Sequence, residues 1–358
     1  MATLKYQQVK KYIIDFMQAE HLKYGDPIPT ESELMKRFDV SRHTVRRALS
    51  DLVNEGWLYT MQGSGTYVSD PNADMNISGK MVGIITTYFR DYIFPDIISG
   101  MDDVFSEEGY SLLLGTTKNN STRERVVLNN MLNNQLAGLI VEPSKSVYPN
   151  QNIQLYRKFI NRGIPVLFIH ATYRALETSY VIQDDEYAGY IVTKHLIDLG
   201  HKYILGIFKQ DDMQGHGRYQ GYQNALEEAG INTGDDLVQW FTTEGSRKVA
   251  SEENIKAWLD ENEKVTAFVC YNDKLAVNVL NSLMALGYSV PQDYSIVSFD
   301  NSKRANTMVT KLTSVAHPKA ELGEKAAHLL IELMKNPNQI FEEVMKPELV
   351  IGDSTRKI

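Results

Sequence analysis

Residues 30–68 constrain the fold of this chain more than any other stretch. Thr30 followed by Glu33 is a capping-box pair, which predicts a helix over residues 31–38. After a short turn, Ser41 can cap a second helix. Two helices joined by so short a turn, the second of them basic, predict a helix-turn-helix unit.

The second predicted helix has two faces. One face is apolar and repeats at helical spacing through Val45, Ala48, Leu49 and Leu52. The opposite face carries guanidinium, imidazole and hydroxyl groups, which a helix in a DNA major groove needs. These are Arg42, His43, Arg46, Arg47 and Ser50.

A glycine-rich turn between two alternating apolar runs follows over residues 57–68, which is typical of a β-hairpin. The alternative is a small helical subdomain whose arginines form a solvated face. The joint order of cap, turn, basic helix and hairpin favours a winged helix-turn-helix and double-stranded DNA as a partner.

The motifs in 29–34, 40–46 and 63–66 resemble the gluconate-repressor (GntR) family over about the first seventy residues. This resemblance implies a set of DNA-facing residues, with the wing tip approaching the minor groove and one lysine before the first helix contacting phosphate. The set is Lys5, Ser32, Ser41, Arg42, His43, Thr44, Arg46, Arg47, Gln62 and Gly63.

The rest of the chain must hold a second compact region, because 358 residues are too many for one winged helix. Hydrophobic residues make up 43%, enough for ordinary cores. The net charge of -8 does not exclude DNA: residues 1–70 carry nine basic and nine acidic side chains, so the deficit lies in the remainder. The positive field is therefore local.

Several classes of protein are disfavoured. Cys270 is the only cysteine, so no disulfide framework or thiolate metal cluster is expected. We expect a cytoplasmic protein without a membrane partner, because no signal-like or membrane-length apolar segment is present. No phosphate loop, nucleophile elbow or metal-ligand spacing occurs, so we expect no enzyme, no metal and no cofactor.

A polar segment with proline and glycine, residues 70–80, reads as a linker. It separates a DNA-binding domain, 1–69, from a second region, 81–358.

The second region alternates short apolar runs with helical patterns. The expected strands cover residues 82–87, 111–114, 138–141, 166–169, 203–208, 267–271 and 295–299. The expected helices cover residues 95–108, 123–134, 152–161, 185–199, 219–229, 252–261, 273–286 and 319–334. This pattern predicts an α/β fold of two doubly wound lobes with parallel sheets, because a single core stops growing at this length.

Four motifs, 181–185, 295–300, 312–315 and 318–323, resemble the lactose and galactose repressors (LacI/GalR type). That resemblance covers roughly residues 80–355. It implies a fold like the periplasmic sugar-binding proteins, with a small-molecule effector between the lobes.

A GntR-type head on a LacI/GalR-type body, together with the motifs in 88–95 and 141–146, is similar to the arabinose repressors of Firmicutes. This implies a homodimeric repressor of arabinose-utilisation genes that L-arabinose releases from its operator. One departure is Gly352-Asp353 before Ser354-Thr355, where the LacI/GalR type usually carries an arginine.

Candidate effector-binding residues follow from the place of polar side chains. Ligands of doubly wound sheets sit outside the carboxyl ends of the strands, where a sugar needs carboxylates, amides, a guanidinium and aromatic faces. Polar residues end four apolar runs: Glu142, His170, Asn272 and Asp300. Arg218 opens a predicted helix where the LacI/GalR type presents an arginine, and three aromatic residues lie on loops at the rim: Tyr92, Phe94 and Tyr173.

Structural explanations stay open for each candidate. Asn272 and Asp300 could be caps or turn formers, and His170 an ordinary loop histidine. Arg218 could pair with Asp211 or Asp212. Tyr92 and Phe94 could pack beneath the next helix. Asp184 is assigned to structure, as a hinge or cap.

Three rival functions also remain: the same switch with another pentose, a hexose or a nucleoside; a transport receptor; and a DNA-binding domain fused to an enzyme.

Overall fold

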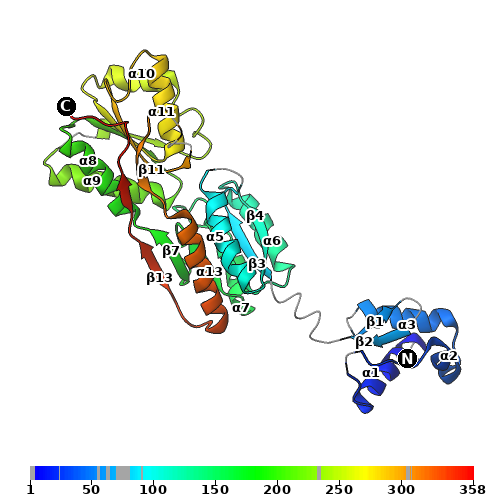
Figure 1. The fold of residues 1–358 in the computed structure, drawn as a ribbon. Coiled ribbons are helices and arrows are strands. Elements are labelled where there is room, and N and C mark those ends of the chain that lie inside the picture. The colour runs from blue at the N-terminus through cyan, green and yellow to red at the C-terminus, as the bar shows by residue number, and fades with distance from the viewer. Residues whose placement is uncertain are drawn as a thin grey trace. The chain divides into compact units, whose positions relative to one another are not determined.

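The computed structural model describes residues 5–23, 25–54, 57–61, 65–69, 81–89, 92–231, 235–303, 307 and 309–358. The chain divides into two compact units, Met1–Lys80 and Met81–Ile358 (Figure 1). The segment predicted as a linker, 70–80, lies outside the described residues.

The first unit contains three helices and a hairpin. Its elements are α1 (Lys5–Ala19), α2 (Glu31–Phe38), α3 (Arg42–Asn54), β1 (Leu58–Met61) and β2 (Gly65–Val68). The predicted capping box is confirmed: the Thr30 hydroxyl accepts from the Glu33 amide, and a Glu33 carboxylate oxygen accepts from the Thr30 amide at 2.7 Å. Asp39 ends α2 in the left-handed region and starts the turn.

The core of this unit lies between the helices. Val45, Ala48 and Leu52 of α3 are fully buried, as their spacing predicts, together with Leu34 of α2 and Ile13 of α1. Strands β1 and β2 pair antiparallel, with Leu58 opposite Val68, so the predicted wing is confirmed. Its tip, 62–64, lies outside the described residues.

The second unit contains two six-stranded sheets, one in each of two lobes. The sheet of lobe 1 has the order β13-β7-β6-β5-β3-β4 and is parallel throughout. Its strands are β3 (Met81–Thr86), β4 (Ser111–Thr116), β5 (Gly138–Val141), β6 (Val166–Ile169), β7 (Ser179–Gln183) and β13 (Glu342–Met345). The helices of this lobe are α5 (Phe94–Glu107), α6 (Ser121–Leu132), α7 (Ile153–Asn161) and α13 (Lys319–Lys335).

The sheet of lobe 2 has the order β14-β12-β11-β10-β8-β9, in which only the β12–β14 pair is antiparallel among the described strands. Its strands are β8 (Ile204–Lys209), β9 (Val238–Phe241), β10 (Ala267–Cys270), β11 (Ser295–Asp300), β12 (Thr313–Ala316) and β14 (Glu348–Val350). The helices are α8 (Asp185–Asp198), α9 (Met213–Glu228), α10 (Glu252–Glu261) and α11 (Asp273–Ala285), with the short 3₁₀ helix η1 (Asp235–Leu237). Two lobes with buried parallel strands were the predicted fold class, and it is confirmed.

The chain passes between the lobes three times. It crosses from β7 to α8, from β12 to α13 and from β13 to β14 (Figure 1). The first two crossings touch each other, because the Gln183 side-chain amide donates to the Ala316 carbonyl at 3.1 Å. Three adjacent crossings leave the lobes free to close like a hinge over whatever lies between them.

One helix was predicted too short. α9 begins at Met213, six residues before the predicted start, because glycines weaken the helical pattern there. Those glycines serve close packing of α9 on α8 (Figure 1). A Cβ on Gly217 would lie 2.9 Å from the Cβ of Asp185, and one on Gly221 would lie 1.9 Å from the Glu186 carbonyl oxygen.

Five strands were not predicted as strands: β7, β9, β12, β13 and β14. Each has at most five residues, and their side chains include glutamate, glutamine and serine, so they lack the apolar runs that marked the others. No described helix has the length and apolar character that a membrane crossing requires.

Candidate functional site

The exposed face of α3 in the first unit is the candidate DNA-binding surface. Arg42, His43, Arg46 and Arg47 are exposed there, as the helical spacing predicts. Ser41 caps the helix: its hydroxyl accepts from the Thr44 amide at 3.3 Å.

Two of these arginines meet one carboxylate. Arg46 Nε donates to Glu31 at 2.9 Å, and Arg42 Nε lies 3.7 Å from the same side chain. Arg47 stacks on the Tyr6 ring at 4.4 Å from its centroid. These contacts hold the guanidinium groups on one side of the helix, where forked donors can meet phosphates or base edges.

The remaining DNA candidates are placed as follows. Ser32 is exposed on α2. Lys5 is the first residue of α1 rather than a residue before it, and its Nζ donates to the Asp39 carbonyl at 3.4 Å. Gln62 and Gly63 lie outside the described residues.

The second unit holds a cavity of about 520 Å³ that residues of both lobes line. Its walls include seven of the eight predicted effector-binding residues: Tyr92, Phe94, Glu142, His170, Arg218, Asn272 and Asp300. Strand ends therefore gather polar side chains at one place, as the parallel-sheet argument predicts. A cavity of this size suits a small polar molecule.

Tyr173 is the exception, and its prediction as a rim residue needs correction. Its ring is 3% exposed in the core of lobe 1, edge-on to Phe168. The hydroxyl donates to Glu124 at 2.6 Å and also lies 2.9 Å from the Ser144 carbonyl oxygen. Glu124 is a fully buried carboxylate, so it requires donors, and Tyr173 supplies one instead of facing the cavity.

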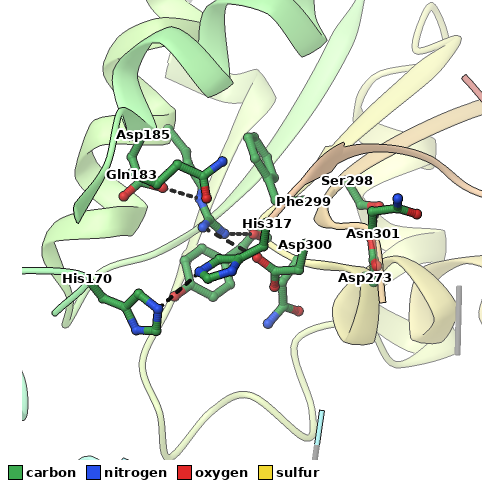
Figure 2. A network of polar contacts seen from close by, with 12 residues as sticks. His170, Gln183, Asp185, Asp273, Ser298, Phe299, Asp300, Asn301 and His317 are labelled. Atoms are coloured by element: carbon green, nitrogen blue, oxygen red, sulfur yellow. Dashed lines mark hydrogen bonds and ion pairs between the residues drawn. The ribbon is translucent and has the colours of Figure 1, made fainter. Parts of the chain in front are cut away.

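Arg218 is buried in lobe 2, in a network that includes Asp185 and Asp300; Figure 2 labels these two carboxylates. Its Nε donates to Asp185 at 2.9 Å, and one terminal nitrogen donates to the Tyr271 carbonyl at 2.6 Å. The other lies 3.7 Å from Asp300. The guanidinium also lies over the Phe299 ring, 4.5 Å from its centroid. The alternative partners Asp211 and Asp212 are wrong, and Arg218 lies inside α9 rather than at its start.

Asp185 and Arg218 form a buried ion pair. Burial raises the pKa of Asp185 to about 6, against the opposing effect of Arg218. The carboxylates of Asp185 and Asp300 in turn raise the pKa of Arg218 against its own desolvation. At neutral pH the pair is therefore charged, and the guanidinium is held in one orientation at the cavity wall.

Glu142 is oriented by neighbours in lobe 1. One carboxylate oxygen accepts from the amide and the hydroxyl of Thr87, at 2.6 and 2.7 Å. The other lies 3.2 Å from His170 Nδ1. This leaves Glu142, which is 8% exposed, as an acceptor at the cavity wall.

Two of the residues considered from the sequence are helix caps. The Asn272 side chain accepts from the Leu275 amide and caps α11, while Asn272 also lines the cavity. Asp184 caps α8 through the Tyr187 amide, as its structural assignment predicted. Asp300 has a φ of 97° and accepts from the Tyr92 hydroxyl. A non-glycine residue in this region carries backbone strain, which is common at ligand sites.

Sequence reasoning missed another polar group in the cavity wall. Lys209 Nζ binds Asp212 at 2.7 Å, and the Tyr271 hydroxyl donates to the same carboxylate at 2.8 Å. Lys209 ends β8 and Tyr271 follows β10. The rule that identified Glu142 and His170 could have found both.

Polar contacts also join the lobes directly. Lys145 of lobe 1 binds Glu244 at 2.7 Å and lies 3.4 Å from Asp211, both of lobe 2. The Asn119 amide donates to the Thr243 hydroxyl at 2.6 Å. These contacts show that the cavity is enclosed between lobes that touch.

Two family patterns match the chain. The pattern of the gntR family of bacterial regulatory proteins matches residues 5–68, and that of a periplasmic binding protein-like domain matches residues 193–355. The arabinose metabolism transcriptional repressor of Geobacillus stearothermophilus is 40% identical over 358 residues, covering 99% of this chain and 98% of that protein. The repressor of the same name from Halalkalibacterium halodurans is also 40% identical, covering 98% and 95%.

The chain belongs to the family of arabinose metabolism transcriptional repressors. It is a DNA-binding regulator and not an enzyme.

Solved structures of other transcription regulators match the second unit of this arabinose-repressor relative. The transcription regulator CcpA of Lactococcus lactis is 29% identical with a TM-score of 0.68, covering 78% of this chain and 100% of that one. A LacI family regulator from Enterococcus faecium with bound ribose is 22% identical with a TM-score of 0.66, covering 78% and 100%. The second comparison shows the fold alone.

Proposed function

We propose that L-arabinose binds in the cavity of the second unit and thereby releases the repressor from its operator. The observation that carries this proposal is that residues of two lobes, joined by three crossings, line one polar cavity. A ligand that contacts both walls binds the closed arrangement more tightly than the open one. It therefore shifts the equilibrium toward closure by that difference in binding free energy.

The chemistry of the cavity favours a neutral sugar. Glu142, Asn272 and Asp300 supply acceptors for hydroxyl groups, and the rings of Tyr92 and Phe94 supply apolar surface for the C–H faces. Lys209 and Arg218, two of the five lysines and arginines in the cavity wall, are already paired with carboxylates. A charged sugar phosphate or acid that reached these two would have to compete with those pairs.

We propose a DNA-binding domain, 1–69, a linker, 70–80, and an effector and dimerisation domain, 81–358. In a homodimer, the exposed faces of two copies of α3 and the wing tips bind two operator half-sites. The proposed contacts are Lys5, Ser32, Ser41, Arg42, His43, Thr44, Arg46, Arg47, Gln62 and Gly63. Lobe closure changes the distance between the two DNA-binding domains of the dimer, so these domains no longer match the spacing of the half-sites. Such a repressor works where its DNA is, in the cytoplasm.

A gel-shift assay with the upstream region of the protein's own operon tests this function. We expect a shifted band without sugar and its loss with L-arabinose, because a coupling of about 3 kcal/mol lowers operator affinity roughly a hundredfold. Sedimentation of the complex should give two chains per operator. A band that L-arabinose leaves in place would contradict the proposal.

Calorimetry with L-arabinose, D-xylose, D-ribose, D-galactose and a nucleoside identifies the effector. If another compound of the panel binds tightly and L-arabinose does not bind, the mechanism of effector-induced release still holds, but L-arabinose is rejected as the effector. Arg46→Ala serves as a matched control here, since it should weaken operator binding and leave the calorimetric titration unchanged.

A further inference from the structure

Two imidazole rings meet at the boundary of the cavity. His170 follows β6 in lobe 1, and His317 lies in the crossing from β12 to α13. Their Nε2 atoms are 3.0 Å apart and the rings are nearly perpendicular (Figure 2). Only His170 lines the cavity, and His317 lies behind it at 5% exposure.

The neighbours of His170 determine which nitrogens carry protons. Glu142 already accepts from two Thr87 donors, and its second oxygen faces His170 Nδ1. A carboxylate has no proton to give, so His170 Nδ1 is the N–H donor of this contact. In the neutral ring, His170 Nε2 then carries a lone pair, and the proton between the two Nε2 atoms belongs to His317.

This arrangement also accounts for the other nitrogen of His317. If His317 Nε2 carries the proton, its Nδ1 is a bare acceptor, and Nδ1 is a buried atom without a hydrogen-bond partner. An unpaired buried acceptor is better tolerated than an unpaired donor. The opposite arrangement would leave an N–H group there without an acceptor.

Burial keeps His317 neutral. It lowers the pKa of His317 well below its ordinary value, and His170, Lys319 and Arg218 act in the same direction. Lys319 comes from α13 and Arg218 from α9. Protonation of both nitrogens of His317 is therefore opposed from both lobes.

We propose that His317 is a positioning residue of the effector site: its Nε2–H donates to the Nε2 lone pair of His170, holds that ring so that its Nδ1–H meets Glu142, and so fixes the Glu142 carboxylate as an acceptor for a sugar hydroxyl. The proposal rests on the sugar-binding function above. It assigns His170 an orienting role as well, because both of its ring nitrogens are already engaged.

Calorimetric titration of the full-length protein with L-arabinose at neutral pH tests this role. In His317→Leu the Nε2 lone pair of His170 has lost its donor, so the His170 ring and the Glu142 carboxylate are no longer held in one orientation. We expect about fivefold weaker binding in this variant than in wild type.

Two further variants separate positioning from packing. A glutamine side chain can donate an N–H to the same lone pair, so His317→Gln should restore the wild-type affinity. His328→Leu removes an exposed imidazole from α13 and should match wild type. Weaker binding of both His317→Leu and His317→Gln would mean a packing role and overturn the proposal, as would unchanged binding of His317→Leu. Operator binding without sugar reports that each variant is folded.

Nitrogen NMR of wild-type protein labelled with ¹⁵N-histidine gives an answer even if His317→Leu does not fold. We expect His317 to show a protonated Nε2 and a bare Nδ1. The reverse tautomer would reject the proposal. The NMR signal is measured without sugar, so it tests the hydrogen bond from His317 to His170 separately from sugar binding. If wild type fails to bind L-arabinose, that result contradicts the proposed function and leaves the tautomer of His317 to be decided by NMR.

Discussion

The hydroxyl of Tyr92 in lobe 1 donates to a carboxylate oxygen of Asp300 in lobe 2 and accepts from the amide of Asp273. Burial and the Asp300 charge raise the pKa of Tyr92 well above its ordinary value, so the phenol keeps its proton. Tyr92 and Asp300 both line the cavity, so this contact joins its two walls.

Tyr92→Phe removes that hydroxyl and leaves the ring. Because the closed arrangement loses a buried donor to Asp300, we expect L-arabinose to bind about fivefold more weakly in calorimetry, with operator affinity unchanged in the absence of sugar. Tyr203→Phe is the matched control, since Tyr203 is an exposed tyrosine of lobe 2 outside the cavity wall. Unchanged sugar affinity in Tyr92→Phe would show that the contact does not couple closure to binding.

Lys145→Met tests the contact between the lobes at Asp211 and Glu244. The lysine is 22% exposed and Asp211 is fully buried, so the substitution removes one of the two lysines that pair with this buried carboxylate and the one that joins it to lobe 1. We expect about tenfold weaker L-arabinose binding and a higher sugar concentration for operator release. Lys158→Met on α7 removes an exposed cation from the same lobe and should behave as wild type. Equal affinities for both variants would contradict a role in closure.

Arg46→Ala should weaken operator binding by at least tenfold, because a forked contact to a base or phosphate contributes about 1–3 kcal/mol. The slope of log affinity against log salt should fall by about one if the lost contact is to phosphate. Fluorescence anisotropy with labelled operator measures both. Lys256→Ala on α10 removes one positive charge from the second unit and controls for net charge. Equal losses in the two variants would disprove a local role of α3.

Asp185→Asn tests the buried pair through pH. The folded pKa is about 6 and the ordinary value is 3.8, so between these values the folded protein holds a proton that the unfolded chain has released. The contribution of Asp185 to stability therefore falls as the pH rises through this window. The asparagine variant lacks this decline.

Urea unfolding at about pH 4, 5 and 6.5 measures the effect. The free energy of unfolding of wild type relative to Asp185→Asn should fall by roughly 2 kcal/mol between the lowest and the highest of these pH values. Asp198→Asn changes an exposed carboxylate on the same helix and should show no such trend. A relative stability that rises with pH would mean that Arg218 outweighs burial.

Local signals in the sequence predicted local structure well. Thr30 and Glu33 lie one helical turn apart, so the capping box needs no information from the rest of the chain. The buried face of α3 follows in the same way from the spacing of Val45, Ala48 and Leu52. The strand-end rule placed Glu142 and Asp300 at the cavity because parallel sheets bring those ends together.

Partners distant in sequence were harder to predict. Nothing near Tyr173 indicates that Glu124, 49 residues earlier, is buried and needs its hydroxyl. Arg218 has acidic neighbours at Asp211 and Asp212, yet it binds Asp185 because α8 packs against α9 at glycines. Close packing of two helices is a tertiary property. The glycines that allow it also weaken the helical pattern at the start of α9, so the first turn and a half of this helix was not predicted.

The last residues of the chain supply one strand to each sheet: β13 pairs with β7 in lobe 1, and β14 pairs with β12 in lobe 2. Ser354 then binds the backbone of both β11 and β12. Translation must therefore pass residue 345 before the sheet of lobe 1 is complete and residue 350 before the sheet of lobe 2 is complete. A nascent chain interrupted before residue 342 would leave β7 and β12 as open edges, which invite aggregation.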